Sequence, residues 1–472
     1  MTSMKKLKLM ICLVGSVLLG ACSDFLKEES QDEVIVKSVA DYSEFLLGAG
    51  YPRPAVALFA PLYLFDDDVE INEKKFVGQN EITPIINRMG FYTWQPDMWE
   101  SSKELTESYS QMYNRVMGVN ATLDYIDDAV GNPEEREQVK AEAFGVRGYI
   151  YYMLVNHFGE PYAHNKEALG VVLKLTSDLK ENGFQRNTVE KVYAQIVNDL
   201  KTSSDLFEKY PKRRGNYRIN ICAVNILLSR VYLYMEEWDN AIDAADKAIK
   251  YAEGLTDYTQ IPRGTKFYLT NYDHSEVEWV YGSGEQNYKR AIQDGFRPSD
   301  DFMSKFKPRD RRLDLWFSAD GLIVTKNRMT TPRSPSTTMR ISEAFLNRAE
   351  AYVQENKLTE ALADLNDLRR HRIEGYQDVS YMDKTKVLDE VRLERRLELC
   401  FDEQRWFDLR RYGMPAVSHD YKVKKGDNWV VYRLKEKDAL YTLPIPNAVI
   451  ENNGKLEQNA SAKEPERTGV QK

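Results

Sequence analysis

The residue types that most often carry catalysis are few and scattered in this chain of 472 residues. No Cys-x-x-Cys, Gly-x-Ser-x-Gly or His-Glu-x-x-His motif occurs, so the common metal and nucleophile signatures are missing. The five histidines share no metal-ligand spacing; they are His157, His164, His274, His371 and His419. Only carboxylate chemistry therefore has enough residues to be considered.

Two groups of carboxylates have a spacing that would suit chemistry. Glu394 and Glu398 lie one helical turn apart, and such a pair could act as an acid and a base. Arg395 and Arg396 lie between them, however, and arginine–carboxylate pairs that fix how helices pack are the simpler interpretation. The run Asp66–Asp68 offers oxygens of the kind Ca²⁺ prefers, but it lacks the spaced ligands of a calcium loop. We therefore expect neither an enzyme nor a metal or cofactor site.

The first 21 residues have the pattern of a secretory signal. Three lysines precede an uncharged run, Leu9–Leu19, and small residues follow it. The run has about half of the roughly 20 residues that a spanning helix needs. Leu19-Gly20-Ala21-Cys22 resembles the bacterial lipobox, in which the cysteine thiol is diacylated and the leader is cut before it. We expect a protein anchored by lipid on Cys22, with residues 22–33 as a short acidic tether.

Without this leader the chain is clearly acidic. Loss of three lysines lowers the count of Lys and Arg from 65 to 62 against 73 Asp and Glu, and the formal charge moves from −8 to −11. This balance argues against nucleic acid as a partner. Cys12 leaves with the leader, so Cys222 and Cys400 are the remaining thiols besides Cys22. Export permits a disulfide between them, but both lie in apolar helical patterns and we expect buried, unpaired thiols.

Helical periodicity dominates the rest of the chain, and we expect residues 34–472 to form a single, mainly α-helical domain. Apolar residues recur at spacings of three and four in 104–128, 134–157 and 189–208. Thr188 is placed to cap the third of these helices. The predicted helix pairs lie near residues 104–157, 189–251 and 342–413.

Two segments repeat a helix–turn–helix pattern at an offset of 120 residues. Small and aromatic residues recur at equivalent places: Val231-Tyr232, Trp238, Ala241 and Ala245 correspond to Ala351-Tyr352, Leu358, Ala361 and Leu365. Small residues at fixed positions let two helices pack closely, as they do in tetratricopeptide repeats. The copies are not in tandem, which predicts a tetratricopeptide-like scaffold of helix pairs separated by long insertions rather than a plain solenoid.

The insertions near residues 50–99 and 255–340 are rich in Gly, Pro, Asn and aromatic residues and show little periodicity. Loops carried on a rigid helical base are where binding usually resides, so we expect the ligand there. Short strand signals occur at 276–281, 322–325, 429–434 and 440–443.

Taken in order, the segments resemble the SusD/RagB family of surface lipoproteins from the nutrient-uptake systems of Bacteroidetes. The opening Cys22–Leu26 is similar to the family's start, and residues 142–162 and 339–372 are similar to two of its helical motifs. Residues 391–413, VRLERRLELCFDEQRWFDLRRYG, resemble its signature. One departure stands out: Glu403-Gln404 replaces the Gly-His that precedes Arg-Trp in the family.

The resemblance implies a binding protein on the outer face of the outer membrane. Such a protein caps a SusC-like TonB-dependent transporter and passes it an oligosaccharide, or a peptide in RagB-like members; a secreted hydrolase is the remaining alternative. Sugars stack an apolar face on an aromatic ring while their hydroxyls meet polar side chains. The residues implied for this role are Tyr63, Tyr92, Trp94, Trp99, Asn287, Tyr288 and Arg290. Tyr92 and Trp94 are the preferred candidates, because they occupy alternate positions of an expected extended segment and their side chains would then face the same way.

Overall fold

The computed structural model describes residues 36–52, 61–78, 80–101, 108–178, 183–212, 214–271, 273–282, 295–326 and 337–472. Cys22, its tether and the candidates Asn287, Tyr288 and Arg290 lie outside the described residues. Ser38–Lys472 form one compact unit, in which helices predominate and the strands are short, so the prediction of a mainly α-helical fold is confirmed. In the described part of the chain, no helix combines the length and the apolar character needed to cross a membrane.

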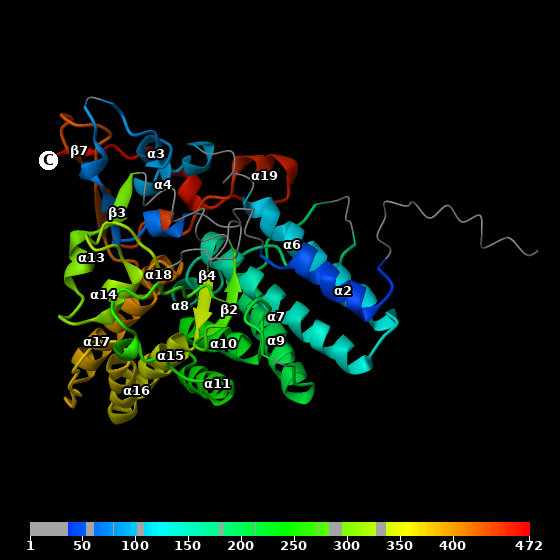
Figure 1. Ribbon diagram of the computed structural model, residues 1–472. Helices are drawn as coiled ribbons and strands as arrows, with labels where there is room; N and C mark the ends of the chain where they lie inside the picture. The colour runs from blue at the N-terminus through cyan, green and yellow to red at the C-terminus, as the bar shows by residue number, and fades with distance from the viewer. Residues whose placement is uncertain are drawn as a thin grey trace, which may run out of the picture. The chain divides into compact units, whose positions relative to one another are not determined.

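Two long, antiparallel helices, α7 (Pro133–Phe158) and α9 (Val189–Lys209), lie at the centre of a group of four helices in the first half of the chain (Figure 1). Local sequence determines where each of the two begins. Asn132 accepts a hydrogen bond from the backbone N–H of Glu134 and Pro133 fills the first helical position, which starts the first of them. Thr188 caps the second, as predicted. The other members of the group are α2 (Val39–Phe45) and α6 (Ser108–Tyr125).

The repeated segments form two helix pairs with the same turn. The first pair is α10 (Ile221–Met235) and α11 (Trp238–Tyr251), and the second is α15 (Ile341–Gln354) and α16 (Leu358–Arg370). In the turn of the first pair, Glu236 follows the end of α10 and has φ 60°. In the turn of the second pair, Asn356 lies 120 residues later and has φ 59°. The predicted repeat of one helix–turn–helix unit is confirmed at the level of the backbone, and its tetratricopeptide class stays a prediction. The pairs lie side by side through α11 and α15 (Figure 1).

The signature segment forms two helices joined by a tight turn. The helices are α17 (Lys384–Glu398) and α18 (Arg405–Arg411). Two residues of the turn, Phe401 and Glu403, have φ of 58° and 62°, in the left-handed region that favours glycine. Shorter helices complete the chain: α3 (Thr83–Ile86), α4 (Met89–Tyr92), α8 (Tyr162–Asn165), α13 (Asp300–Ser304), α14 (Arg311–Trp316) and α19 (Asn447–Asn452).

The strands form three small antiparallel sheets. β1 (Val69–Ile71) pairs with β3 (Phe296–Pro298), and β2 (Val277–Tyr281) pairs with β4 (Thr337–Arg340). The third sheet has the order β5 (Val417–Tyr421), β6 (Val430–Leu434) and β7 (Val470–Gln471).

Two of the four strand predictions are confirmed, those at 276–281 and 429–434. Residues 322–325 contribute only an isolated bridge, between Val324 and Phe317. The strand predicted at 440–443 is wrong. Asp438 accepts a hydrogen bond from the N–H of Leu440 and starts a 3₁₀ helix, Ala439–Tyr441, in its place.

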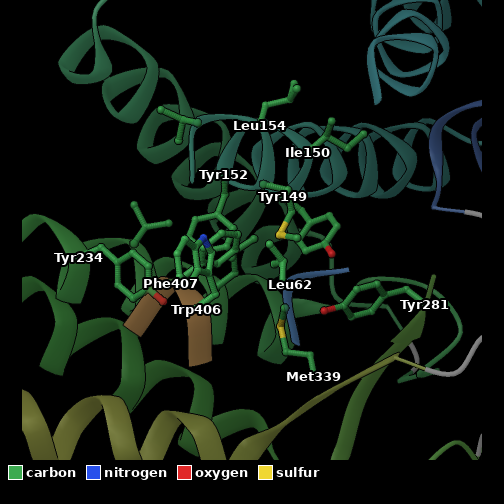
Figure 2. Close-up of a cluster of buried hydrophobic side chains, with 14 of the residues drawn as sticks. Leu62, Tyr149, Ile150, Tyr152, Leu154, Tyr234, Tyr281, Met339, Trp406 and Phe407 are labelled. Atoms are coloured by element: carbon green, nitrogen blue, oxygen red, sulfur yellow. The ribbon is translucent and has the colours of Figure 1, made fainter. Parts of the chain in front are cut away.

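Aromatic side chains fill the core where α7, α10 and α18 meet (Figure 2). The ring of Phe407 packs edge-on against Tyr152, and Trp406 stacks on Tyr441 with centroids 4.6 Å apart. Such ring pairs contribute about 0.5–1.5 kcal/mol beyond the area they bury. The signature's Trp-Phe pair is therefore structural. Cys222 and Cys400 are both buried and unpaired, which confirms the prediction of free thiols.

Candidate ligand-binding site

Four of the aromatic residues expected to stack on a sugar lie in the core instead. Their exposed fractions are 0–4%, for Tyr63, Tyr92, Trp94 and Trp99. The indole N–H of Trp94 donates to the carbonyl of Phe65 at 3.1 Å, and that of Trp99 donates to the carbonyl of Pro444 at 2.7 Å. Because a sugar needs an exposed ring face, the structure contradicts the prediction of ligand contact at these four positions and gives them a packing role.

Tyr92 and Trp94 do face one common group, but that group is a histidine of the same chain. Tyr92 ends α4 and Trp94 has φ 51°, so the extended segment expected here is not formed. The His419 ring lies between the two rings, 4.2 Å from Tyr92 and 4.3 Å from Trp94 by centroid, and is stacked on both. Its two nitrogens lie 2.7 Å and 2.8 Å from the carbonyl oxygens of Tyr92 and Asp66. Tyr92 and Trp94 therefore hold β5, which carries His419, against the segment at the end of α4.

The acidic run Asp66–Asp68 is held by arginines of the signature. Arg405 grips Asp67 with two hydrogen bonds of 2.7 Å and 2.9 Å, and Arg396 donates to Asp68 at 2.7 Å. Burial opposes ionisation of Asp67, but the hydrogen bonds and charges of the arginines outweigh it and lower its pKa to about 2. The carboxylates lie close enough together to share a cation, yet the guanidinium groups already supply the positive charge that Ca²⁺ would bring.

The other charges of the signature belong to a buried network. Glu398 is contacted by Arg312 at 3.0 Å and Arg372 at 2.9 Å, and also by Arg340. Burial opposes ionisation of Glu398, but the charges of these three arginines outweigh it and hold its pKa well below the usual range. A carboxyl kept ionised by three cations has no proton to give and no free lone pair to act as a base.

Glu394 is equally committed, because Arg312 and Arg369 contact it at 2.7 Å and 2.6 Å. The network also reaches Glu276 on the chain before β2, which Arg372 contacts at 2.6 Å. The predicted arginine–carboxylate pairing is confirmed, and the geometry gives no support to an acid–base pair at Glu394 and Glu398.

One carboxyl of the signature is placed differently. Glu403 is buried, and no ion pair or hydrogen bond joins its side chain to the described residues. Burial, with a contribution from the charge of Asp402, raises the pKa of Glu403 from near 4.5 to about 8. Its backbone is also left-handed, in the position where the family pattern has glycine. The turn thus combines backbone strain with an unpaired carboxyl.

An open hollow with aromatic side chains lies where the segment 211–220 joins α9 to α10. It has a volume of about 200 Å³, and its wall includes the end of α9, the start of α10 and the last residue of α11. Tyr217 is 52% exposed there, and Tyr251 is half-buried. Apolar groups form the floor, among them Phe207, Ile219 and Cys222.

Ion pairs fix the segment that carries Tyr217. Arg214 donates to Glu278 at 3.1 Å and to the carbonyl of Val277 at 3.0 Å, which ties it to β2. Arg218 donates at 3.0 Å to Glu142 of α7. The Tyr217 ring lies over Gly215, where an added methyl group would be 3.3 Å from Cε1. The ring is therefore held in place with part of its surface open to solvent.

Two larger hollows next to the β5–β6–β7 sheet differ in chemistry. Their volumes are about 480 Å³ and 460 Å³, and Lys437–Ala439 contribute to both. The residues that line them are mostly polar, including Glu160, His164 and Arg433, and His164 carries the one aromatic ring among the described lining residues. Of these hollows, only that beside Tyr217 has tyrosine side chains among its described lining residues.

The sequence predictions did not single out the segment that carries Tyr217, because they placed binding in the long insertions. A signal was present. The stretch from Pro211 to Asn220 is polar and non-periodic between two strongly apolar helical patterns, and Gly215 marks a close approach of another group. A single tyrosine in so short a loop gives little reason to choose it over the others.

Two family profiles together match most of the chain. The sequence profile described as the SusD family matches residues 178–461, which is more than half of the chain. A second profile, SusD-like and described as starch-binding and associating with the outer membrane, matches residues 53–233. No curated protein sequence matches the chain.

Several solved structures share the fold. A SusD superfamily protein from Bacteroides thetaiotaomicron has a TM-score of 0.72 and 22% identity, over 89% of this chain and 99% of that one. A SusD-like carbohydrate-binding protein from Bacteroides vulgatus has 0.66 and 19%, over 89% and 97%. A superfamily member from Bacteroides fragilis has 0.70 and 20%, over 90% and 100%. Identities this low establish the fold and leave the ligand open.

Proposed function

The chain belongs to the SusD family, and we propose that it is a lipid-anchored surface protein that captures an oligosaccharide and passes it to a SusC-like TonB-dependent transporter. The observation that carries the proposal is the family match over residues 178–461, together with a second match whose description names starch binding and the outer membrane. The lipobox at Cys22 supports the anchor.

The geometry of the charged residues supports binding rather than catalysis. Glu394 and Glu398, the two carboxylates considered as an acid–base pair, are each bound to two or more arginines within the core. These two carboxylates are therefore not available to a substrate. The hollows at the surface remain as places where a ligand could be bound without being chemically changed.

Calorimetric titration of the purified Cys22→Ala protein tests the proposed ligand class. The panel is maltohexaose, xylohexaose, mannohexaose and chitohexaose, with a casein digest as the peptide arm. We expect saturable binding of at least one glycan and none of the digest. Saturable binding of the digest with no heat from any glycan would refute glycan capture and favour peptide uptake.

The anchor has its own test. The wild-type protein should sediment with the outer-membrane fraction, whereas Cys22→Ala should appear in the soluble fraction and keep its glycan affinity, because the described fold begins many residues after Cys22. A Ser23→Ala variant is the matched control, since it leaves the acceptor thiol in place. If Cys22→Ala stayed with the membrane, the lipid would not be the anchor.

A further inference from the structure

The connection between α6 and α7 leaves two large apolar side chains open to water. Tyr125 is 54% exposed and Val130 is 76% exposed, whereas Ile126, which follows Tyr125, is buried and fixes the connection to the core. Exposed apolar side chains that gather in one place, with polar residues around them, mark surfaces that contact other molecules. Whether these two form one surface depends on what holds the connection.

Helix α2 lies beside the connection and contacts it at two points one turn apart (Figure 1). The backbone N–H of Val39 donates to the carbonyl of Val130 at 3.0 Å. Burial raises the pKa of the Tyr42 hydroxyl, and the nearby groups of Tyr125 and Asp128 raise it further. Both exposed side chains therefore lie along the same edge of α2. The backbone that carries them is held before any partner arrives, so less conformational entropy is lost on contact.

Negative charge borders the two apolar side chains. Residues 124–140 contain six Asp and Glu against two Lys and Arg, a formal charge of −4. The exposed acidic residues of this segment that lie closest to the turn are Asp127, Asp128, Glu134 and Glu135. Of the two cations, Lys140 contacts Asp127 at 3.0 Å and Arg136 donates to a backbone carbonyl at 2.7 Å. An apolar centre with an acidic border is complementary to a protein surface that has an apolar recess and a basic rim.

The connection also lies where the chain from Cys22 joins the fold. Sixteen peptide bonds link Cys22 to Ser38, and a fully extended chain of that length spans at most roughly 55 Å. With the proposed lipid on Cys22, this end of the protein stays near the membrane, and a partner fixed in the same membrane is held at a high effective concentration. Lipid headgroups with negative phosphates would repel the acidic border, so the charge favours a protein over the bilayer itself.

We infer that the α6–α7 connection, together with the adjoining edge of α2, is the surface on which this protein docks against a membrane-embedded protein with a basic rim. The inference rests on the proposed function, in which that partner is the transporter, and adds the surface and its charge. Docking is thereby assigned to the end of the fold that the lipid would hold near the membrane.

The first test is photo-cross-linking in the cells that make the full-length, lipidated protein. The probe is p-benzoylphenylalanine in place of Tyr125, and the control is the same probe in place of Met382. Met382 is 59% exposed and precedes α17, which lies on the other side of the molecule from α2 and α6 (Figure 1). Irradiation should join position 125 to a TonB-dependent transporter, identified by mass spectrometry of the adduct, with roughly tenfold less adduct from position 382.

Four results of this experiment would overturn the inference. They are no adduct at position 125, an adduct with lipid, an adduct with a second copy of this chain, and equal transporter yields from the two positions. An adduct with lipid would show that the surface faces the bilayer.

The second test reverses charge in the protein that carries the probe at position 125. Asp128→Lys with Glu135→Lys should lower the adduct yield by about fivefold or more, because the basic rim would then meet like charge. The matched control is Glu355→Lys with Glu360→Lys, which makes the same change of charge at exposed positions beside and within α16. The control should stay within about twofold of the starting yield. Melting curves of the purified variants should show that all of them fold. Equal yields from the two double variants would refute the role of the acidic border.

The outcomes separate the docking surface from the proposed function. Glycan titration and membrane fractionation of Cys22→Ala do not depend on the α6–α7 connection. If both give the expected results and position 125 yields no transporter adduct, the docking surface is refuted while glycan capture and the anchor stand. If the protein also binds no glycan in the panel, both proposals fail.

Discussion

Replacing Glu403 with glycine should stabilise the protein, because Glu403 brings two separate penalties to the turn between α17 and α18. Its φ of 62° costs a side-chain-bearing residue roughly 1–2 kcal/mol. Glycine removes this cost but loses roughly 0.5–1 kcal/mol through the greater freedom of the unfolded chain. The backbone change alone therefore predicts a gain of roughly 0–1.5 kcal/mol at every pH, with about 0.75 kcal/mol at the middle of this range.

The second penalty comes from the carboxyl and depends on pH. Burial raises the pKa of Glu403 to about 8, so the folded protein holds a proton that the unfolded chain releases above pH 4.5. The protonated carboxyl of Glu403 imposes no penalty on the folded state below pH 4.5, and the folded state is progressively destabilised as the pH rises from 4.5 towards 8. At about 1.36 kcal/mol per unit, the loss reaches about 3 kcal/mol at pH 7 and about 5 kcal/mol above pH 8, as upper limits.

Two variants separate the penalties in urea unfolding curves recorded at pH 4.5 and pH 8. Glu403→Gln keeps the left-handed backbone and removes the charge, so it should match wild type at pH 4.5 and exceed it at pH 8. Glu403→Gly should exceed wild type at both values. Phe401→Gly is the control, because Phe401 shares the backbone geometry but packs on Phe302, and losing its ring should cost about 3–5 kcal/mol.

The reasoning would be refuted by either of two results. If Glu403→Gly were less stable than wild type at pH 4.5, the backbone at position 403 would not be strained. If the difference between Glu403→Gln and wild type were the same at both pH values, the carboxyl would not hold a proton in the folded state.

Two further predictions concern the core. Arg372→Met should lower the free energy of unfolding by about 3–5 kcal/mol in urea titrations, because it removes a cation from two buried carboxylates. The control is Arg370→Met, which removes an ion pair of a side chain that is 47% exposed and should cost about 1 kcal/mol or less. Equal losses for the two variants would count against the network. In a Cys22→Ala background, Cys222 and Cys400 should not react with Ellman's reagent until urea unfolds the protein, since burial raises the pKa of both thiols; rapid reaction of the native protein would show that one of them is accessible.

The parts of the fold that followed from sequence were those with local causes. Thr188 caps α9 through its own hydroxyl, and apolar residues every three or four positions fixed the buried faces of α6 and α9, whereas α7 is buried on all sides from Gly145 to Phe158. The repeat at an offset of 120 residues predicted even the turn, since Glu236 and Asn356 have nearly the same φ. The signature's arginines and carboxylates also form ion pairs as expected, but their partners lie on other segments, such as Arg369 for Glu394 and Asp408 for Arg395.

The site predictions failed because exposure of an aromatic ring is decided by distant residues. Trp94 is covered by His419, which lies more than 300 positions later, and Trp99 is held by the carbonyl of Pro444. Neither partner can be recognised from the residues around the tryptophan.

The charge network around Glu398 has a consequence for how the protein resists proteolysis. It joins residues from Glu276 to Asp402, so the second helix pair cannot peel away without leaving several charges unpaired in an apolar interior. Partial opening is then nearly as costly as complete unfolding, and the open forms that a protease needs should be rare. For the surface lipoprotein that we propose, such cooperativity would mean a long working life among extracellular proteases.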